Sequence, residues 1–257
     1  GTSRFETTPA GLYASVCLPN LIVGTVGGGT GTPTARECLG LVECVGDGTA
    51  PKLAEIAAAL VLAGEISINA ALASAPALPV AFPGSGLGQQ LAQVAQIISV
   101  RGALGMNRQI FFVATGGFDT HDAQLADQPG LLANISRSLA AFYRATAEMG
   151  VASEVTAFTQ SDFGRTLTSN GDGTDHAWGG NQLVIGGAVA GRTIYGRYPL
   201  LSIDGPEDVG GGRMIPAVSC DQYAATLAAW FGVPDAALAS VAPHIGNFAE
   251  RDLGFFN

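Results

Sequence analysis

"RQIFFVAT", residues 108–115, is the stretch that decides the fold class. It is a short apolar run bounded by turn residues, which is the pattern of a strand buried in a parallel sheet. Apolar residues at helical spacing precede it in residues 87–105 and follow it in residues 131–151. We therefore predict a strand at 108–115 between two helices, the alternation that is typical of an α/β fold.

Four further segments continue this alternation, and three of them are short apolar runs. The predicted strands are 154–161, 181–189 and 193–196, and the predicted helix is 221–233. Asp221 is the candidate N-cap of that helix. The order of elements predicts a mostly parallel sheet with flanking helices, with the functional site outside the carboxyl ends of the strands.

The chain changes character near residue 70. Before this point a strand-like run leads through the glycine-rich loop 24–31 into the alanine-rich stretch 50–73. Pro51 suits the first turn of a helix, so we predict one long helix there. Proline and glycine then mark residues 74–88 as irregular. The predicted organisation is a small α+β segment at 1–70, a linker at 71–88 and an α/β segment at 89–257.

Composition excludes some classes of partner. The net charge is −9, and only twelve lysines and arginines are scattered along the chain. A nucleic-acid binder needs a concentrated positive surface, so nucleic acid is excluded. No apolar stretch is expected to reach the length of a membrane span. The most apolar one carries Glu65, and we expect a packed helix there and no membrane partner.

The cysteines and the first residues leave the compartment open. Cys17, Cys38, Cys44 and Cys220 show no CxxC spacing, and this favours free thiols over a zinc knuckle. One disulfide remains an alternative. We recognise no signal peptide at Gly1.

Polar residues that follow the predicted strands are candidate metal ligands. Asp119 and His121 lie two positions apart just past a predicted strand, so both side chains point to one side. Asp162 follows the next predicted strand, and Asp175 and His176 lie in the glycine-rich loop "NGDGTDHAWGG". Two imidazoles and three carboxylates that converge would suit zinc or manganese. A separation of more than about 12 Å between the two histidines would exclude a shared ion.

Two further residues have candidate catalytic roles. Arg165 is placed to pair with an anionic substrate oxygen. Ser161 is a reserve nucleophile, with His121 or His176 as its base, so His176 is a candidate for catalysis as well as for metal binding. Aspartate and asparagine beside glycine are also the usual residues of turns, and a purely structural role for these side chains stays open.

The segment up to about residue 70 resembles part of the catalytic domain of hydroxymethylglutaryl-CoA reductase. The resemblance rests on "LPNLIVGTVGGGTGTPTARECL" and "KLAEIAAALVLAGEISI", with the glycine run 27–29 as its most specific part. That family works with a glutamate, a lysine and an aspartate earlier in its chain and a histidine after this helix. The present sequence leaves the pattern after Ile68, so we expect no mevalonate chemistry.

Residues from about 69 to 257 resemble domain-of-unknown-function family 1501. The motifs are "RQIFFVATGGFDTHDAQ", "SDFGRTLTSNGDGTDHAWGGNQLVIGGAV", "IYGRYP" and "VSCDQYAATLAAWFGV". Members are typically exported bacterial proteins with distant similarity to the alkaline phosphatase and sulfatase superfamily. In that superfamily an Asp and His pair, a second aspartate and a late histidine bind metal. Phe163 follows Asp162 where the superfamily usually has a histidine, so one ligand of a two-metal site is absent.

The family also places a further part before these motifs, and here the reductase-like piece stands in its position. The sequence therefore predicts a chimaera. We expect an ester hydrolase, acting on a small-molecule carboxylic, phosphate or sulfate ester with the help of a divalent metal. The alternatives are a serine esterase, and a non-catalytic chimaera that self-associates. Truncated folds expose surface that their parents bury, so we expect a homo-oligomer.

Overall fold

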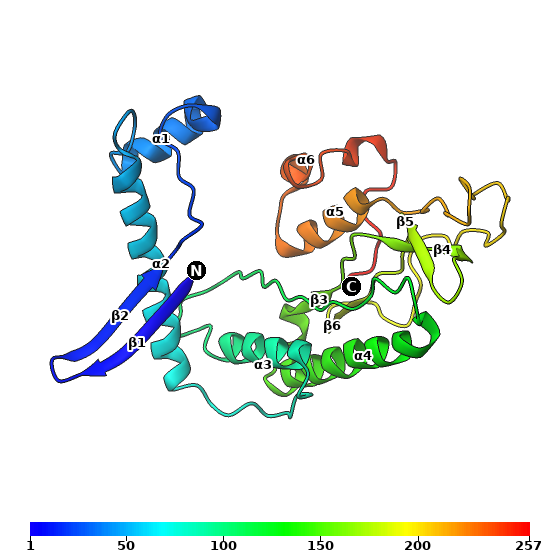
Figure 1. Cartoon of the computed structure of the whole chain (residues 1–257), viewed down its shortest axis with the longest axis horizontal. Helices are drawn as coiled ribbons and strands as arrows, with labels where there is room; N and C mark the ends of the chain where they lie inside the picture. Colours follow the sequence, from blue (N-terminus) through cyan, green and yellow to red (C-terminus); the bar gives the residue numbers. More distant parts are fainter. The chain divides into compact units, whose positions relative to one another are not determined.

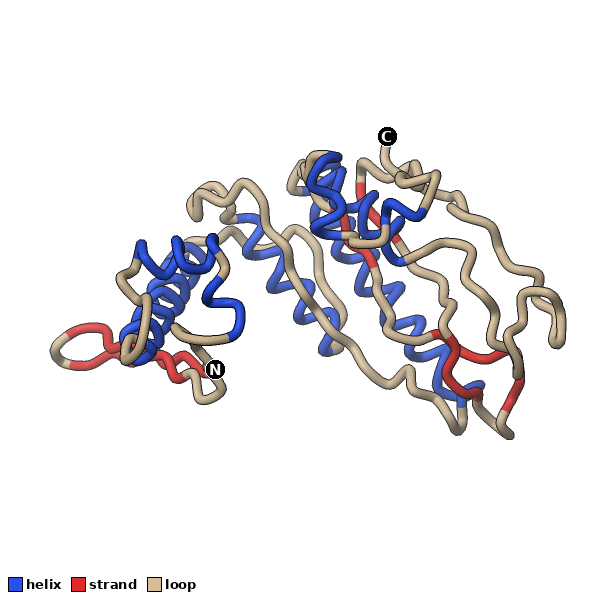
Figure 2. Tube along the Cα trace, turned by 90° about the horizontal axis from the view of Figure 1, so that it is seen from above, coloured by secondary structure: helices blue, strands red, loops and turns tan.

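The computed structural model of the protein describes residues 1–257, with the surroundings of Gly28 excepted. The chain forms two compact units. The first comprises Gly1–Ala75 and Val100–Met106, and the second comprises Pro76–Ser99 and Asn107–Asn257 (Figures 1 and 2). The boundary after Ala75 falls within the segment 71–88 that was predicted to be a linker.

The first unit is a hairpin and a set of helices. Strand β1, Thr2–Thr8, pairs antiparallel with β2, Gly11–Cys17. The short 3-10 helix η1, Gly28–Gly31, leads into α1, Pro33–Leu41, and the long helix α2, Ala50–Ala73, follows. Both α-helices have proline in the first turn, where its missing N–H costs no hydrogen bond. The predicted long helix is confirmed.

Helix α2 corrects one prediction. It has 24 residues, a mean hydropathy of 1.9 over its most apolar window and no buried residue. By length and composition it is able to cross a membrane, so the prediction that no apolar stretch reaches that length is wrong. Glu65 accepts a hydrogen bond from the Ser3 hydroxyl at 3.1 Å. One apolar helix is weak grounds for a membrane partner, and the absence of such a partner stays a prediction.

The core of the second unit lies between helices α3, Gly86–Ser99, and α4, Gln124–Glu148. Helix α3 buries apolar residues at helical spacing, and Phe142 and Ala145 of α4 belong to the same buried cluster. The buried residues of α3 in this cluster are Leu87, Leu91, Val94, Ala95 and Ile98. Burying a large aliphatic or aromatic side chain contributes about 1.5–3 kcal/mol, so this helix pair anchors the unit.

Residues 108–115 do not form the predicted strand. Burial alternates along the segment, since Phe111 and Val113 pack on the helical core while Ile110 and Phe112 are exposed. The backbone lacks a pairing strand. The Gln90 side chain instead donates to the Ala114 carbonyl at 2.9 Å and accepts from its N–H at 3.0 Å. The prediction of a strand buried in a parallel sheet is therefore wrong for this segment, in its hydrogen bonding and in the burial of Ile110 and Phe112.

The strands of the second unit pair antiparallel. Strand β3, Thr156–Phe158, pairs with β6, Val184–Gly186, and β4, Gly164–Ser169, pairs with β5, Thr174–Ala177. Within the described residues no two strands pair in parallel, and residues 193–196 form no strand. The mixture of helix and sheet agrees with an α/β protein, but the predicted mostly parallel sheet is not confirmed.

The C-terminal part of the second unit consists mainly of short helices. Helix α5 spans Cys220–Phe231. Ser219 is its N-cap and forms a capping box with Gln222. The predicted N-cap Asp221 is therefore wrong by two positions, and its carboxylate accepts from the His244 N–H at 2.7 Å. The remaining elements are the 3-10 helices Ala152–Glu154 (η2), Asp235–Ala237 (η3) and Ile245–Asn247 (η4), and α6, Leu238–Val241.

Candidate metal centre

The β4–β5 hairpin carries one half of the candidate site. Arg165 on β4 lies opposite His176 on β5, and an irregularity follows before Ser169 pairs with Thr174. The connecting turn is closed by the Asn170 N–H, which donates to the Gly173 carbonyl at 3.1 Å. Asp175 and His176 were expected in a flexible loop, and the structure places both on a strand.

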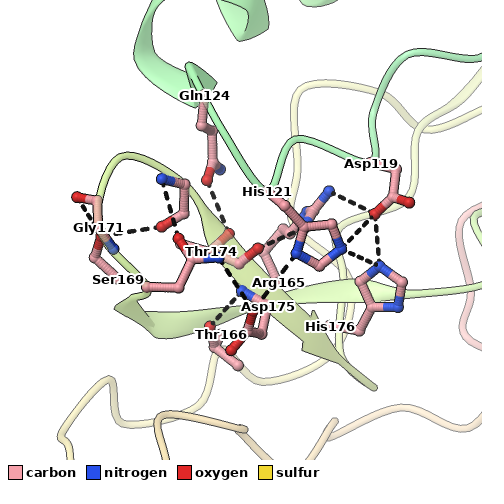
Figure 3. A network of polar contacts seen from close by, with 12 residues as sticks. Asp119, His121, Gln124, Arg165, Thr166, Ser169, Gly171, Thr174, Asp175 and His176 are labelled. Carbon is pink, nitrogen blue, oxygen red and sulfur yellow. Dashed lines mark hydrogen bonds and ion pairs between the residues drawn. The ribbon is translucent and has the colours of Figure 1, made fainter.

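The segment that carries Asp119 and His121 docks against this hairpin. The Gln124 N–H donates to the Asp172 carbonyl at 3.1 Å, and the Gln124 side chain accepts from the Thr174 hydroxyl at 2.8 Å (Figure 3). Gly173 permits the close approach, because a Cβ atom there would stand 2.2 Å from the His121 carbonyl oxygen. Helix α4 starts at Gln124, so the same contacts fix the entry to that helix.

Three side chains converge as a result. Asp119 Oδ1 lies 2.6 Å from His176 Nε2 and 2.9 Å from His121 Nε2, and the two Nε2 atoms are 3.2 Å apart (Figure 3). The histidines are thus far closer than the 12 Å that would have excluded a shared ion. All three side chains are partly exposed, at 61% for Asp119, 43% for His121 and 48% for His176, so the group is open to solvent.

The donor set fits a divalent transition metal. Ligand atoms around a tetrahedral zinc ion stand about 3.3 Å apart, as expected from metal–ligand distances of about 2.0–2.1 Å. The three edges here are 2.6, 2.9 and 3.2 Å, so they need to open by about 0.7, 0.4 and 0.1 Å to reach that spacing. Two imidazoles and one carboxylate also form the protein part of several hydrolytic zinc sites, which keep one position open.

The structure separates the other predicted ligands from this triangle. Asp175 Oδ1 is 3.5 Å from Nδ1 of His121 and accepts from the Asn170 amide at 3.1 Å. It therefore lies on the Nδ1 side of His121, where a carboxylate can orient a metal-binding imidazole through the nitrogen that does not bind the metal. Asp162 is exposed and is absent from the group of three that the described residues bring together. Its role as a ligand stays a prediction.

The two predicted catalytic side chains are engaged within the protein. The Ser161 hydroxyl donates to the Phe163 carbonyl at 2.7 Å, and the contacts of the described residues include none between Ser161 and a histidine. The Arg165 side chain is 15% exposed. It donates to the carbonyls of Thr174 and Phe118 and lies 3.3 Å from Asp119 Oδ1. These contacts tie the two halves of the site together.

One residue of the site was not foreseen. The Phe163 ring stacks on the His176 imidazole, with centroids 4.1 Å apart and planes 14° from parallel, and Arg165 Cζ lies 5.1 Å from the centroid of the same ring. No polar motif marks an aromatic residue of this kind. Its position directly before a strand that carries site residues was the one available signal.

Electrostatics favour an ionised Asp119. The hydrogen bond from His176 lowers the pKa of the Asp119 carboxyl below its ordinary value of 3.8. The charges of His121, His176 and Arg165 act in the same direction, while partial desolvation opposes them. A carboxylate is the form that binds a metal ion.

This lowered pKa predicts a pH dependence of stability in the metal-free protein. A carboxyl whose pKa is lower in the folded state stabilises the fold above its unfolded pKa of about 3.9, and the contribution is lost as pH falls through the folded value. Chemical denaturation in EDTA should therefore show the wild type more stable than Asp119→Asn at pH 5. The difference should shrink as pH falls below about 4. A difference that stays constant down to pH 2.5 would contradict the assigned interaction.

Comparison with known families places the chain. The family model described as "Protein of unknown function (DUF1501)" matches residues 51–235, more than half of the sequence. The chain belongs to the DUF1501 family. All residues of the donor triangle, Asp119, His121 and His176, lie within the matched range. No solved structure matches the chain.

The first unit of this DUF1501 protein has a second relationship. The model of hydroxymethylglutaryl-coenzyme A reductase matches residues 2–79, and residues 51–79 are common to both matches. The 3-hydroxy-3-methylglutaryl-coenzyme A reductase of Methanocaldococcus jannaschii is 51% identical over 74 residues, 29% of this chain and 18% of that protein. The enzyme of that name from Aeropyrum pernix is 54% identical over 79 residues, 29% and 19% of the two chains.

These relatives bear on the origin of the chain more than on its activity. The chain spans about a fifth of the length of the reductases it matches. Together, the two family matches confirm the resemblances on which the predicted chimaera rests.

Proposed function

We propose that this DUF1501 protein is a metal-assisted hydrolase of ester bonds. The observation that carries the proposal is the triangle of Asp119 Oδ1, His121 Nε2 and His176 Nε2, whose edges are 2.6–3.2 Å. The distant similarity of the family to the alkaline phosphatase and sulfatase superfamily supports the same class of reaction. The substrate class is a small carboxylic, phosphate or sulfate ester.

The three side chains of the triangle would hold one zinc or manganese ion. Such an ion supplies Lewis acidity, which polarises an ester or phosphoryl oxygen and makes hydroxide available near neutral pH. Asp175 would orient the His121 ring through Nδ1 and leave Nε2 as the atom that binds the metal. The exposure of the three side chains leaves room for a substrate to approach.

Arg165 has a supporting part in this proposal. Its guanidinium lies 3.3 Å from Asp119 and donates to the carbonyls of Phe118 and Thr174, so it holds the carboxylate in place. The hydrogen bond from His176 and, to a smaller extent, the charge of Arg165 lower the pKa of Asp119. An arginine has five N–H donors, and pairing of a remaining donor with a substrate oxygen stays a prediction. The proposed site therefore depends on one largely buried cation, Arg165, for its assembly.

The test is hydrolysis of p-nitrophenyl acetate, butyrate, phosphate and sulfate by the purified full chain, each with and without EDTA. We expect turnover of at least one ester that EDTA abolishes and that zinc or manganese restores. His121→Ala should remove this turnover. His244→Ala is the matched control, because His244 lies outside the group of three.

Two outcomes would overturn the proposal. Ester turnover that is indifferent to EDTA would move the chemistry to Ser161 with a histidine base. No turnover of any ester, together with no zinc bound at equilibrium, would favour the non-catalytic alternative. In that case the oligomeric state would test whether the chain acts by self-association.

A further inference from the structure

We propose that Phe163 is a positioning residue that fixes the imidazole of His176, so that its Nε2 atom faces Asp119 and His121. The link from this positioning to metal binding rests on the proposed function. The positioning itself is a property of the metal-free protein and is tested separately.

The stacking geometry carries the argument. The Phe163 and His176 rings lie 4.1 Å apart at their centroids and are within 14° of parallel. The χ2 torsion of histidine has broad minima, so an imidazole that is 48% exposed would otherwise sample many ring planes. A stacked phenyl ring restricts the imidazole to one plane. It also hinders the ring flip, because a turning imidazole must pass through an orientation that the phenyl ring occupies.

Asp119 then selects one of the two orientations left in that plane. Its Oδ1 atom lies 2.6 Å from His176 Nε2, within hydrogen-bonding distance. The flipped imidazole would present carbon instead of nitrogen to the carboxylate. Phe163 sets the plane of the His176 ring, and Asp119 sets which edge of that ring faces the site. Together they determine the position of Nε2.

Phe163 is itself held in place from two sides. The Ser161 hydroxyl donates to its carbonyl at 2.7 Å, which fixes the backbone just before β4. Arg165 Cζ lies 5.1 Å from its ring centroid, within the range of a cation–π contact. The same guanidinium lies 3.3 Å from Asp119. Arg165 therefore contacts both Phe163, which sets the plane of the His176 ring, and Asp119, which sets the direction of its Nε2 atom.

The first arm of the test is NMR of the histidine side chains in the metal-free full chain. The sequence has three histidines, so their ring signals can be assigned by substitution. In the wild type we expect upfield-shifted ring protons for His176 and a single tautomer with the proton on Nε2, because that nitrogen donates to Asp119. Phe163→Leu should remove the shift and average the tautomers. Phe163→Tyr, which keeps an aromatic plane, should restore both.

The second arm is zinc affinity, measured by competition with a chromophoric chelator. Loss of an outer-shell partner weakens metal binding about 10- to 100-fold, so we expect Phe163→Leu to bind zinc at least about tenfold more weakly. Phe163→Tyr should bind as the wild type does. Thermal unfolding of each variant shows whether a change is confined to the site or reflects loss of the fold.

The outcomes separate this inference from the proposed function. Unchanged His176 signals in Phe163→Leu would overturn the positioning role. Changed signals with unchanged zinc affinity would overturn the link to metal binding. A wild type that binds no zinc, while Phe163→Leu still releases the His176 ring, would overturn the metal site of the proposed function and support the positioning role.

Discussion

Asp119→Asn is expected to reduce zinc affinity on the order of 100-fold or more. This exceeds the loss expected when a residue that only supports a metal ligand is replaced. Asp119 Oδ1 is the shared vertex of the site, 2.6 Å from His176 and 2.9 Å from His121. Asparagine keeps the size of the side chain but removes its charge. Two neutral imidazoles then remain, and zinc sites in proteins usually need a third strong donor.

The measurement is a competition titration together with the zinc content of the protein after dialysis. Asp122→Asn is the matched control, because it makes the same change of charge at an exposed carboxylate three positions along the chain. Any general attraction of cations to this acidic protein falls equally in both variants. Equal zinc affinity of Asp119→Asn and the wild type would show that the triangle is only a hydrogen-bonded cluster.

The meeting of Asp119, His121 and His176 was predictable from sequence for local reasons. Alternation in an extended segment places residues 119 and 121 on one side, and the glycine-rich segment around Asp175 was expected to fold back over the same edge, although as a loop and not as the strand that forms. What the sequence did not specify was the order of contacts. Asp175 lies 3.5 Å from Nδ1 of His121, whereas His176 lies 3.2 Å from Nε2 of the same ring.

Local side-chain patterns did not predict which strands pair. Residues 108–115 have the alternating burial of a strand, yet β3 pairs with β6 and β4 pairs with β5. Side-chain period determines which face of a segment is buried, whereas pairing depends on segments far away in sequence. The parallel sheet was inferred from the order of elements, and that order does not specify which backbones exchange hydrogen bonds.

Local polar preferences misled in a different way. Asp221 and Ser219 are both good N-cap residues, and the choice between them depends on Gln222, which completes the capping box with Ser219. Asp162 was predicted as a ligand because it is a carboxylate at a strand end, and that role stays a prediction. The residue beside it, Phe163, is the one that contacts His176. Lists of metal-binding residue types omit such supporting aromatic side chains.

Gly173→Ala is expected to separate the two halves of the site and to destabilise the second unit. The added Cβ would stand 2.2 Å from the His121 carbonyl oxygen, 2.3 Å from its carbonyl carbon and 2.6 Å from the Thr120 carbonyl oxygen. All three are backbone atoms, so no side-chain rotation relieves the overlap. Forced insertion of this kind typically costs about 1–3 kcal/mol of stability. The segment that carries Asp119 and His121 must therefore move away from the hairpin.

The expected readouts are a lower unfolding midpoint in urea, loss of the His121 and His176 NMR signals typical of the wild type, and loss of zinc binding. Gly116→Ala is the matched control, because a Cβ atom there meets no atom within 4 Å and the residue precedes the same segment. A Gly173→Ala protein with wild-type stability and zinc affinity would mean that the segment docks elsewhere. The donor triangle would then lose its structural basis, since the site depends on the close approach of that segment to Gly173.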